Sequence, residues 1–208
     1  RYSELLKVDP KAIEKVDFIT NKIVDEANKI FKETFTNELL RGFGSIILAL
    51  YSFVPEKAKI LFDCLLAPIP LSSWETLQAT SSVVQCCFNL ASIAAGINEN
   101  DKQESFLRLG NQKAKQIDSW KSSYDLYWAC RSLVKIPSPE IMDGLLIMLK
   151  SVQKISPPST NEYIETLAQV TTFYIEGLLS TTSDPESEMM KINNVLKNLQ
   201  NFLEDSLK

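Results

Sequence analysis

The sequence predicts an all-α protein made of stacked antiparallel helical hairpins, with about nine helices and no sheet. Three observations lead to this fold class. Apolar residues recur at intervals of three and four along most of the 208-residue chain, which is the spacing of one helical face. Prolines and helix-capping residues fall between these periodic segments, where they start and stop helices. No run shows the sustained apolar–polar alternation of a strand.

The first part of the chain contains three predicted helices. Asp9 caps a long amphipathic helix over Pro10 to Phe35, whose apolar stripe suits either a helix of another chain or its own domain. We favour its own domain, because the pattern lasts only about three heptads. Thr36 and Asn37 offer caps for a second helix, which is apolar on nearly every face in its later part, and a third helix opens at Pro55.

The next segment is predicted to hold two further helices. Ser72 and Glu75 match a capping box, in which a hydroxyl and a carboxylate satisfy the free amides of a helix start. We therefore expect one helix to run from here towards Ile97. Asn100 is the expected cap of the following helix, which continues to Ile117.

The stretch from Ser119 to Leu179 repeats the order of helix, proline stop, cap and helix. The first apolar face in it comprises Trp120, Tyr124, Tyr127, Trp128, Cys130, Leu133 and Val134. Pro137 then stops the helix, and Ser138–Pro139 suits the start of the next one. Ser159 and Glu162 match a second capping box.

Such hairpins have more apolar surface than each can bury alone, so neighbouring hairpins must stack on them. Trp74, Trp120 and Tyr163 occupy similar places in successive segments, 46 and 43 residues apart, close to the length of a HEAT or armadillo unit. We interpret residues 1–208 as a single all-helical domain. Because the chain opens with Arg1, we expect a fragment of a longer helical-repeat protein or a processed form. The alternative to a repeat array is a single irregular helical bundle.

The composition argues against catalysis and against metal binding. There is no histidine, which removes the commonest general base and the commonest metal ligand. None of the four cysteines lies in a Cys-x-x-Cys pair, so a structural zinc site is not expected. We predict no catalytic residue, no metal site and no cofactor. A few carboxylates near apolar faces are expected to be partly buried, without a spacing that selects a catalytic pair: Asp63, Asp143, Glu165 and Glu176.

Cysteine usage and hydropathy bear on the compartment. All four cysteines lie in apolar helical runs and no Asn-x-Ser/Thr sequon occurs. We therefore expect reduced, buried thiols in an intracellular reducing compartment, either the cytoplasm or the nucleus, with an organelle as the alternative. The longest largely apolar run, Ile46 to Val54, is much shorter than the ~20 residues of a spanning helix, so no membrane insertion is expected.

Charge is unevenly distributed along the chain. The net charge is −4 and the isoelectric point is near 5.1, yet residues 102–135 carry seven Lys or Arg against three acids. A candidate partner or nucleic-acid face in this region comprises Lys113, Lys115, Lys121, Arg131 and Lys135. Because aromatic residues are interleaved with these cations, the face suits single-stranded RNA. The alternative, which we favour, is an aromatic core stripe beside a solvated basic face.

One segment carries a family resemblance. Leu126-Tyr-Trp-Ala-Cys-Arg-Ser-Leu133, followed by Pro139 and by Ile141-Met-Asp-Gly-Leu-Leu146, resembles one unit of the heptatricopeptide-type helical repeats. These repeats occur in organellar RNA-binding proteins related to the FAST-kinase group. The resemblance covers about one unit, and it implies association with RNA in an organelle.

Two functions from different classes follow. We favour a non-enzymatic scaffold, a protein–protein interaction subunit of a larger assembly, with end contacts made by the helix over Pro10 to Phe35 and by a last helix from Pro185. The alternative is an organellar helical-repeat protein that binds RNA through residues 102–135. A helical enzyme or a small-ligand carrier ranks third, so no small-molecule substrate is predicted.

Overall fold

The computed structural model describes residues 10–33, 37–51, 55–67, 71–136, 138–155 and 160–181, together with scattered positions between 186 and 201. Its elements are α2 (Pro10–Glu33), α3 (Asn37–Tyr51), α4 (Pro55–Leu66), α5 (Leu71–Glu75), α6 (Ser81–Gly96), α7 (Asn100–Gln116), α8 (Ser123–Leu133), α9 (Ile141–Ser151), the 3-10 helix η1 (Val152–Lys154) and α10 (Thr160–Thr181). Over these ranges the chain has no strand, so the all-α prediction is confirmed.

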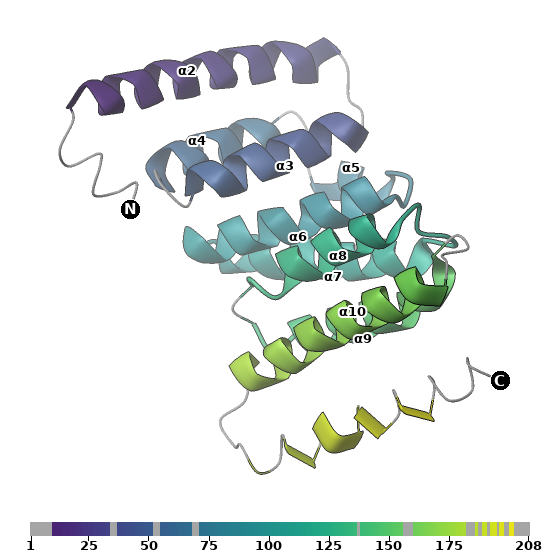
Figure 1. Cartoon of the computed structure of the whole chain (residues 1–208). Helices are drawn as coiled ribbons and strands as arrows, with labels where there is room; N and C mark the ends of the chain where they lie inside the picture. The colour runs from purple at the N-terminus through teal and green to yellow at the C-terminus, as the bar shows by residue number, and fades with distance from the viewer. Residues whose placement is uncertain are drawn as a thin grey trace.

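The helices lie in two rows that run along a stack. Consecutive helices α3 and α4, α6 and α7, and α8 and α9 contact each other as hairpins. Helix α6 also packs on α3 and on α8, and α8 packs on α10, so these helices form one row, while α7 packs on α9 in the other. Figure 1 shows the stack running from α2, which packs on α4 at one end, to α9 and α10 towards the other.

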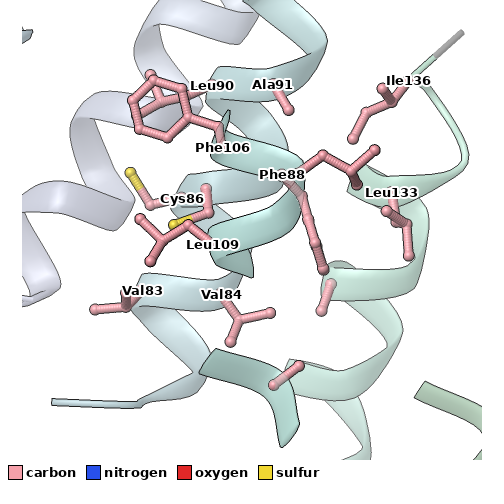
Figure 2. Close-up of a cluster of buried hydrophobic side chains, with 14 of the residues drawn as sticks. Val83, Val84, Cys86, Phe88, Leu90, Ala91, Phe106, Leu109, Leu133 and Ile136 are labelled. Atoms are coloured by element: carbon pink, nitrogen blue, oxygen red, sulfur yellow. The ribbon is translucent and has the colours of Figure 1, made fainter. Parts of the chain in front are cut away.

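One continuous apolar core joins the hairpins. Figure 2 shows side chains of α6 and α7 meeting Leu133 of α8 and Ile136 just after it. The ring of Phe106, on α7, packs edge-on against Trp74 of α5 at 5.4 Å and against Phe62 of α4 at 6.2 Å between centroids. Each of these three aromatic side chains is fully buried. Three successive hairpins therefore share the same interior instead of forming separate cores.

Several predicted helix starts are confirmed. Helices α2 and α4 begin at Pro10 and Pro55, as predicted. Helix α3 begins at Asn37 itself, so Asn37 is its first residue, and the other predicted cap, Thr36, lies outside the described residues. Helix α7 begins at Asn100 itself, so the cap is Glu99, one residue earlier than predicted. The helix ends predicted at Asp9, Phe35, Ser159 and Pro185 lie outside the described residues, whereas the described positions between 186 and 201 are helical.

The start predicted at Ser138–Pro139 is correct to within two residues. Helix α9 begins at Ile141, and the residues before it form a turn. The Ser138 hydroxyl donates a hydrogen bond to the carboxylate of Glu140, and Ile141 N–H donates to the Ser138 carbonyl at 3.3 Å. Pro139 and Glu140, which the sequence predicts to be the first helical residues, belong to this tight turn, and the α-helix starts after them.

The capping box at Ser72 and Glu75 does not open a long helix. The structure places both residues inside the short helix α5, after which the chain leaves the helix, and α6 starts only at Ser81. The cap of α6 is Thr80, whose Oγ1 accepts from Val83 N–H at 3.3 Å. Where α5 ends, a side chain from α7 binds carbonyl groups of the chain that leads into α6.

That side chain is Lys113, near the end of α7. Its Nζ donates to the carbonyl oxygens of Glu75 at 2.7 Å and of Leu77 at 2.5 Å, and the residue is only 3% exposed. Both carbonyls belong to the segment that leads into α6. The ammonium group thereby links the end of α7, the second helix of the hairpin, to the segment that precedes α6, the first helix. We call such a contact a hairpin lock.

A second hairpin lock closes α8 and α9. Lys154 Nζ, just after α9, donates at 2.9 Å to the carbonyl of Ile117, in the segment that leads into α8. The caps of the two hairpins repeat as well, because Ser122 accepts from Asp125 N–H at 3.3 Å, as Thr80 does from Val83. Each lysine and each cap recurs after about 40 residues, which is near the length of one HEAT or armadillo unit.

Trp120 does not belong to the helical face predicted for it. It precedes Ser122, the cap of α8, and lies in an extended segment where its N–H donates to the Lys154 carbonyl at 2.9 Å. An isolated parallel bridge pairs it with Ile155. Its side chain is fully buried. Pairing of the two connecting segments therefore takes precedence over the three-and-four spacing that suggests a helix.

The close approach of α7 to α6 gives a first testable prediction. A Cβ at Gly110 would lie 2.5 Å from a ring carbon of the buried Phe88, so we expect Gly110→Ala to lower the free energy of unfolding by about 2 kcal/mol through overpacking. Gly42 is the matched control, since it is helical and exposed and a Cβ there would have nothing within 4 Å. Gly42→Ala should stabilise by about 0.5–1 kcal/mol. Urea denaturation of both variants tests this, and equal shifts would contradict it.

Candidate functional site

A groove lies between the first half of α8 and the facing side of α10. Its volume is about 330 Å³. The lining residues come from both helices and are Ser123, Tyr124, Tyr127, Glu162, Glu165, Thr166 and Gln169. The two helices are separated in sequence by all of α9 but pack directly on each other. Stacking of hairpins therefore creates this hollow, and no single hairpin contains it.

The α8 wall of the groove is aromatic. Tyr124, Tyr127 and Trp128 fall on one helical face because their spacing is three and four. Their rings pack edge-on, with centroids 5.8 Å apart for Tyr124 and Trp128 and 5.7 Å for Tyr127 and Trp128. Tyr127 also packs on Phe173 of α10 at 5.3 Å. Tyr124 remains 64% exposed, an unusual state for a ring in an otherwise packed row.

The α10 wall of the groove is acidic. Glu162 Oε1 accepts a hydrogen bond from Ser123 Oγ at 2.6 Å, and Glu165 Oε1 accepts from Gln169 Nε2 at 3.3 Å. Glu162 and Glu165 occupy the same side of α10 at a spacing of three. None of the described lining residues is Lys or Arg. The groove thus combines two carboxylates with two tyrosine rings and carries negative charge.

The aromatic row meets a cation at its other end. The guanidinium of Arg131 lies over the ring of Trp128, 4.8 Å from its centroid. This geometry is a cation–π contact, and it uses part of the Arg131 side chain within its own helix. Arg131 is not among the residues that line the groove.

The five residues of the predicted basic face do not form one surface. Lys113 is buried in its hairpin lock, whereas Lys115, Lys121, Arg131 and Lys135 are exposed. Lys121 precedes α8 and Lys135 follows it. An 11-residue helix spans about 16 Å, so these two lie at opposite ends of α8. Lys121 and Lys135 therefore cannot share one binding patch on α8, and the acidic groove lies beside the aromatic rings.

The carboxylates predicted to be partly buried are in fact exposed: Asp63, Asp143, Glu165 and Glu176. Asp63 belongs to a surface ion-pair network, at 3.7 Å from Lys59 Nζ and 3.8 Å from Lys102 Nζ. Glu99 completes the network and accepts a hydrogen bond from Lys59 at 3.0 Å, which lowers the pKa of Glu99. Among the described residues no group of three or more His, Cys, Asp or Glu could hold a metal ion.

The long helix α2 presents a second exposed apolar surface. Thr20 is buried and Ile23 and Val24 pack against the core, so the helix does cover its own domain. On another side, Phe18 and Ile19 are 68% and 54% exposed.

The cysteines are free, as predicted, and three of them are fully buried. Burial raises the pKa of the Cys87 thiol to about 12, although the nearby Lys113 ammonium opposes this shift. Burial likewise raises the pKa of Cys86 and of Cys130. At neutral pH these thiols are protonated and therefore poor nucleophiles.

The raised thiol pKa predicts alkaline destabilisation. An unfolded cysteine titrates near 9.0 and folded Cys87 near 12, so the stabilisation from its neutral form is complete below pH 9 and is lost as the pH rises. Each such thiol should lower the free energy of unfolding by about 1.4 kcal/mol per pH unit in that window. We expect Cys87→Ala to flatten the decline between about pH 9 and 11, and to leave the slope between pH 6 and 8 unchanged. Urea denaturation across pH measures this, and an unaltered alkaline slope would refute it.

Comparisons with protein-family models, with curated protein sequences and with solved structures give no significant match. The resemblance of residues 126–146 to a heptatricopeptide-type unit therefore stays a prediction, as does the assignment to a HEAT or armadillo array. In the part of the chain that the structure describes, no helix is both long enough and apolar enough to cross a membrane.

The residue pattern predicts only half of this groove. The spacing of Tyr124, Tyr127 and Trp128 indicates a shared helical face, from which Tyr124 and Tyr127 line the groove. The facing carboxylates are not predicted, because the local pattern assigns Glu162 only to a capping box. Its contact with Ser123 spans 39 residues, and no local pattern encodes such a distance.

Proposed function

We propose that this chain is a non-enzymatic helical-repeat scaffold that binds a partner protein through the groove between α8 and α10. The observation that carries the proposal is the open groove itself, with an exposed tyrosine ring and two oriented carboxylates. Exposed aromatic side chains in a concavity are typical anchors of protein interfaces.

The recurrence of the hairpin locks supports the repeat architecture. The equivalent lysines, Lys113 and Lys154, and the equivalent caps, Thr80 and Ser122, each lie about 40 residues apart, as expected for HEAT and armadillo units. Stacked units of this kind usually serve as extended binding surfaces, which agrees with a scaffold and not with an enzyme.

The RNA-binding alternative has weaker support. Phosphates require clustered cations, whereas Lys113 is buried and Lys121 and Lys135 lie at opposite ends of α8. Bases would have to stack on Tyr124 and Tyr127 beside two carboxylates, which repel the nucleic-acid backbone. An RNA would therefore have to use a basic surface away from the groove.

Site-specific crosslinking tests the proposal. A photoreactive phenylalanine analogue at Tyr124 should crosslink one defined protein in cells that express the chain. The same analogue at Ile60 of α4, which is 46% exposed, is the control and should not capture that protein. With the captured protein purified, Tyr124→Ala should weaken binding by about tenfold or more, and Ile60→Ala should not. If Tyr124 crosslinks no protein, or only RNA, the proposal is wrong.

A further inference from the structure

We propose that the groove between α8 and α10 receives a lysine or arginine side chain from a basic peptide segment of the partner protein. The inference rests on the proposed function in one respect, namely that the ligand is a protein. It adds the chemistry that the ligand must have.

Charge complementarity is the first step. Glu162 and Glu165 supply two carboxylates on one wall, and the other described lining residues are uncharged serine, threonine, glutamine and tyrosine side chains. A ligand with a positive side chain gains from both carboxylates, and a ligand with an anionic group is repelled by both. The overall net charge of −4 also supports a basic ligand, because a negatively charged protein attracts basic segments.

The aromatic wall is the second step. Lysine and arginine cations bind to the faces of aromatic rings at about 6 Å or less from the centroid. The same row already holds one such cation, since Arg131 lies 4.8 Å from the centroid of Trp128. Tyr124 and Tyr127, which line the groove, offer further ring surface, and Tyr124 is largely exposed.

Preorganisation is the third step. The hydrogen bonds from Ser123 to Glu162 and from Gln169 to Glu165 hold each carboxylate in place. These contacts reduce the side-chain freedom that a ligand would have to restrict on binding. The volume of about 330 Å³ is near the lower limit of ligand pockets and suits one long side chain with its adjoining backbone.

Titration with short synthetic peptides tests the inference on the whole chain. The peptides share one Gly-Ser backbone and carry lysine, arginine, glutamine or glutamate at the same positions; a single-stranded oligoribonucleotide is the fifth probe. Binding is followed at low salt by amide resonances in two-dimensional NMR. We expect the lysine and arginine peptides to shift resonances around Ser123 and from Glu162 to Gln169, with an affinity about tenfold or more above that of the glutamine peptide.

Matched charge variants locate the contact. Glu162→Gln with Glu165→Gln should weaken binding of the lysine peptide by about tenfold, and Tyr124→Leu should weaken it severalfold. The control pair is Asp101→Asn with Glu104→Gln, on exposed positions of α7, which makes the same change in net charge. That control should leave the affinity within about twofold, because only the general attraction is altered.

The outcomes separate the two proposals. Equal binding of the glutamine and lysine peptides at the groove would overturn the cation preference and leave a protein-binding scaffold. Equal loss in both charge-variant pairs would show that the attraction is non-specific, and it would overturn the groove as the cation site. No binding of any basic peptide would also overturn it, whereas crosslinking at Tyr124 decides the scaffold function independently. Binding of the oligoribonucleotide alone would refute both.

Discussion

Replacing Lys113 by methionine is expected to lower the free energy of unfolding by about 3 kcal/mol. The side chain is buried, and its ammonium donates to the carbonyls of Glu75 and Leu77. Hydrogen bonds from charged groups contribute about 1.5–3 kcal/mol each. Removal of the charge also relieves its desolvation, which offsets part of that loss. Two carbonyls would lose this donor, and α5 would lose its tie to α7.

Lys115→Met is the control for this prediction. It lies on the same helix, is exposed, and should change stability by less than about 0.5 kcal/mol. Urea denaturation measures both variants, and amide hydrogen exchange should show faster exchange over residues 76–80 in the Lys113 variant. Comparable stability of the two variants would mean that the Lys113 hairpin lock contributes nothing to the free energy of unfolding.

Trp120→Ala is expected to have the largest effect, a loss of about 4 kcal/mol in the free energy of unfolding. The side chain is fully buried between hairpins, and truncation of a buried tryptophan leaves a cavity that the surroundings fill only in part. The extended segment would also lose the packing that keeps Trp120 N–H on the Lys154 carbonyl, at 2.9 Å.

Trp120→Phe separates packing from polar contacts. The indole Nε1 of Trp120 is buried and has no hydrogen-bond partner in the structure, so phenylalanine removes an unsatisfied donor while it keeps most of the apolar volume. We expect this variant to lose no more than about 1.5 kcal/mol. Thermal and urea denaturation provide the measurement, and a phenylalanine variant as unstable as the alanine variant would contradict a packing role.

The fold is predictable where a local signal decides it. Pro10 and Pro55 each begin a helix, because the fixed backbone angle of proline acts within one turn. The capping box at Ser72 and Glu75 fails for the opposite reason. The carbonyls at and just after the end of α5 bind Lys113, 36 to 38 residues away along the chain, and a short-range pattern contains no information about that contact.

The candidate site is predictable to a similar extent. The three-and-four spacing places Tyr124, Tyr127 and Trp128 on one face, but the local excess of Lys and Arg overstates the basic character of that region. Lys113 is predicted on a surface, although tertiary packing buries it. The acidic wall comes from α10, which the stacking of hairpins brings against α8. The residues that line a groove are therefore decided by packing between helices about 40 residues apart in the sequence.

The hairpin locks also provide a natural gauge of local opening. An amine that is bonded to two carbonyls and shielded from water cannot react with an acylating reagent or an acetyltransferase until its hairpin comes apart. The labelling rate of Lys113, relative to that of its accessible neighbour Lys115, would therefore report how often the α6–α7 hairpin opens. Acylation of Lys113 while the hairpin is open would remove the positive charge and keep the hairpin from closing again.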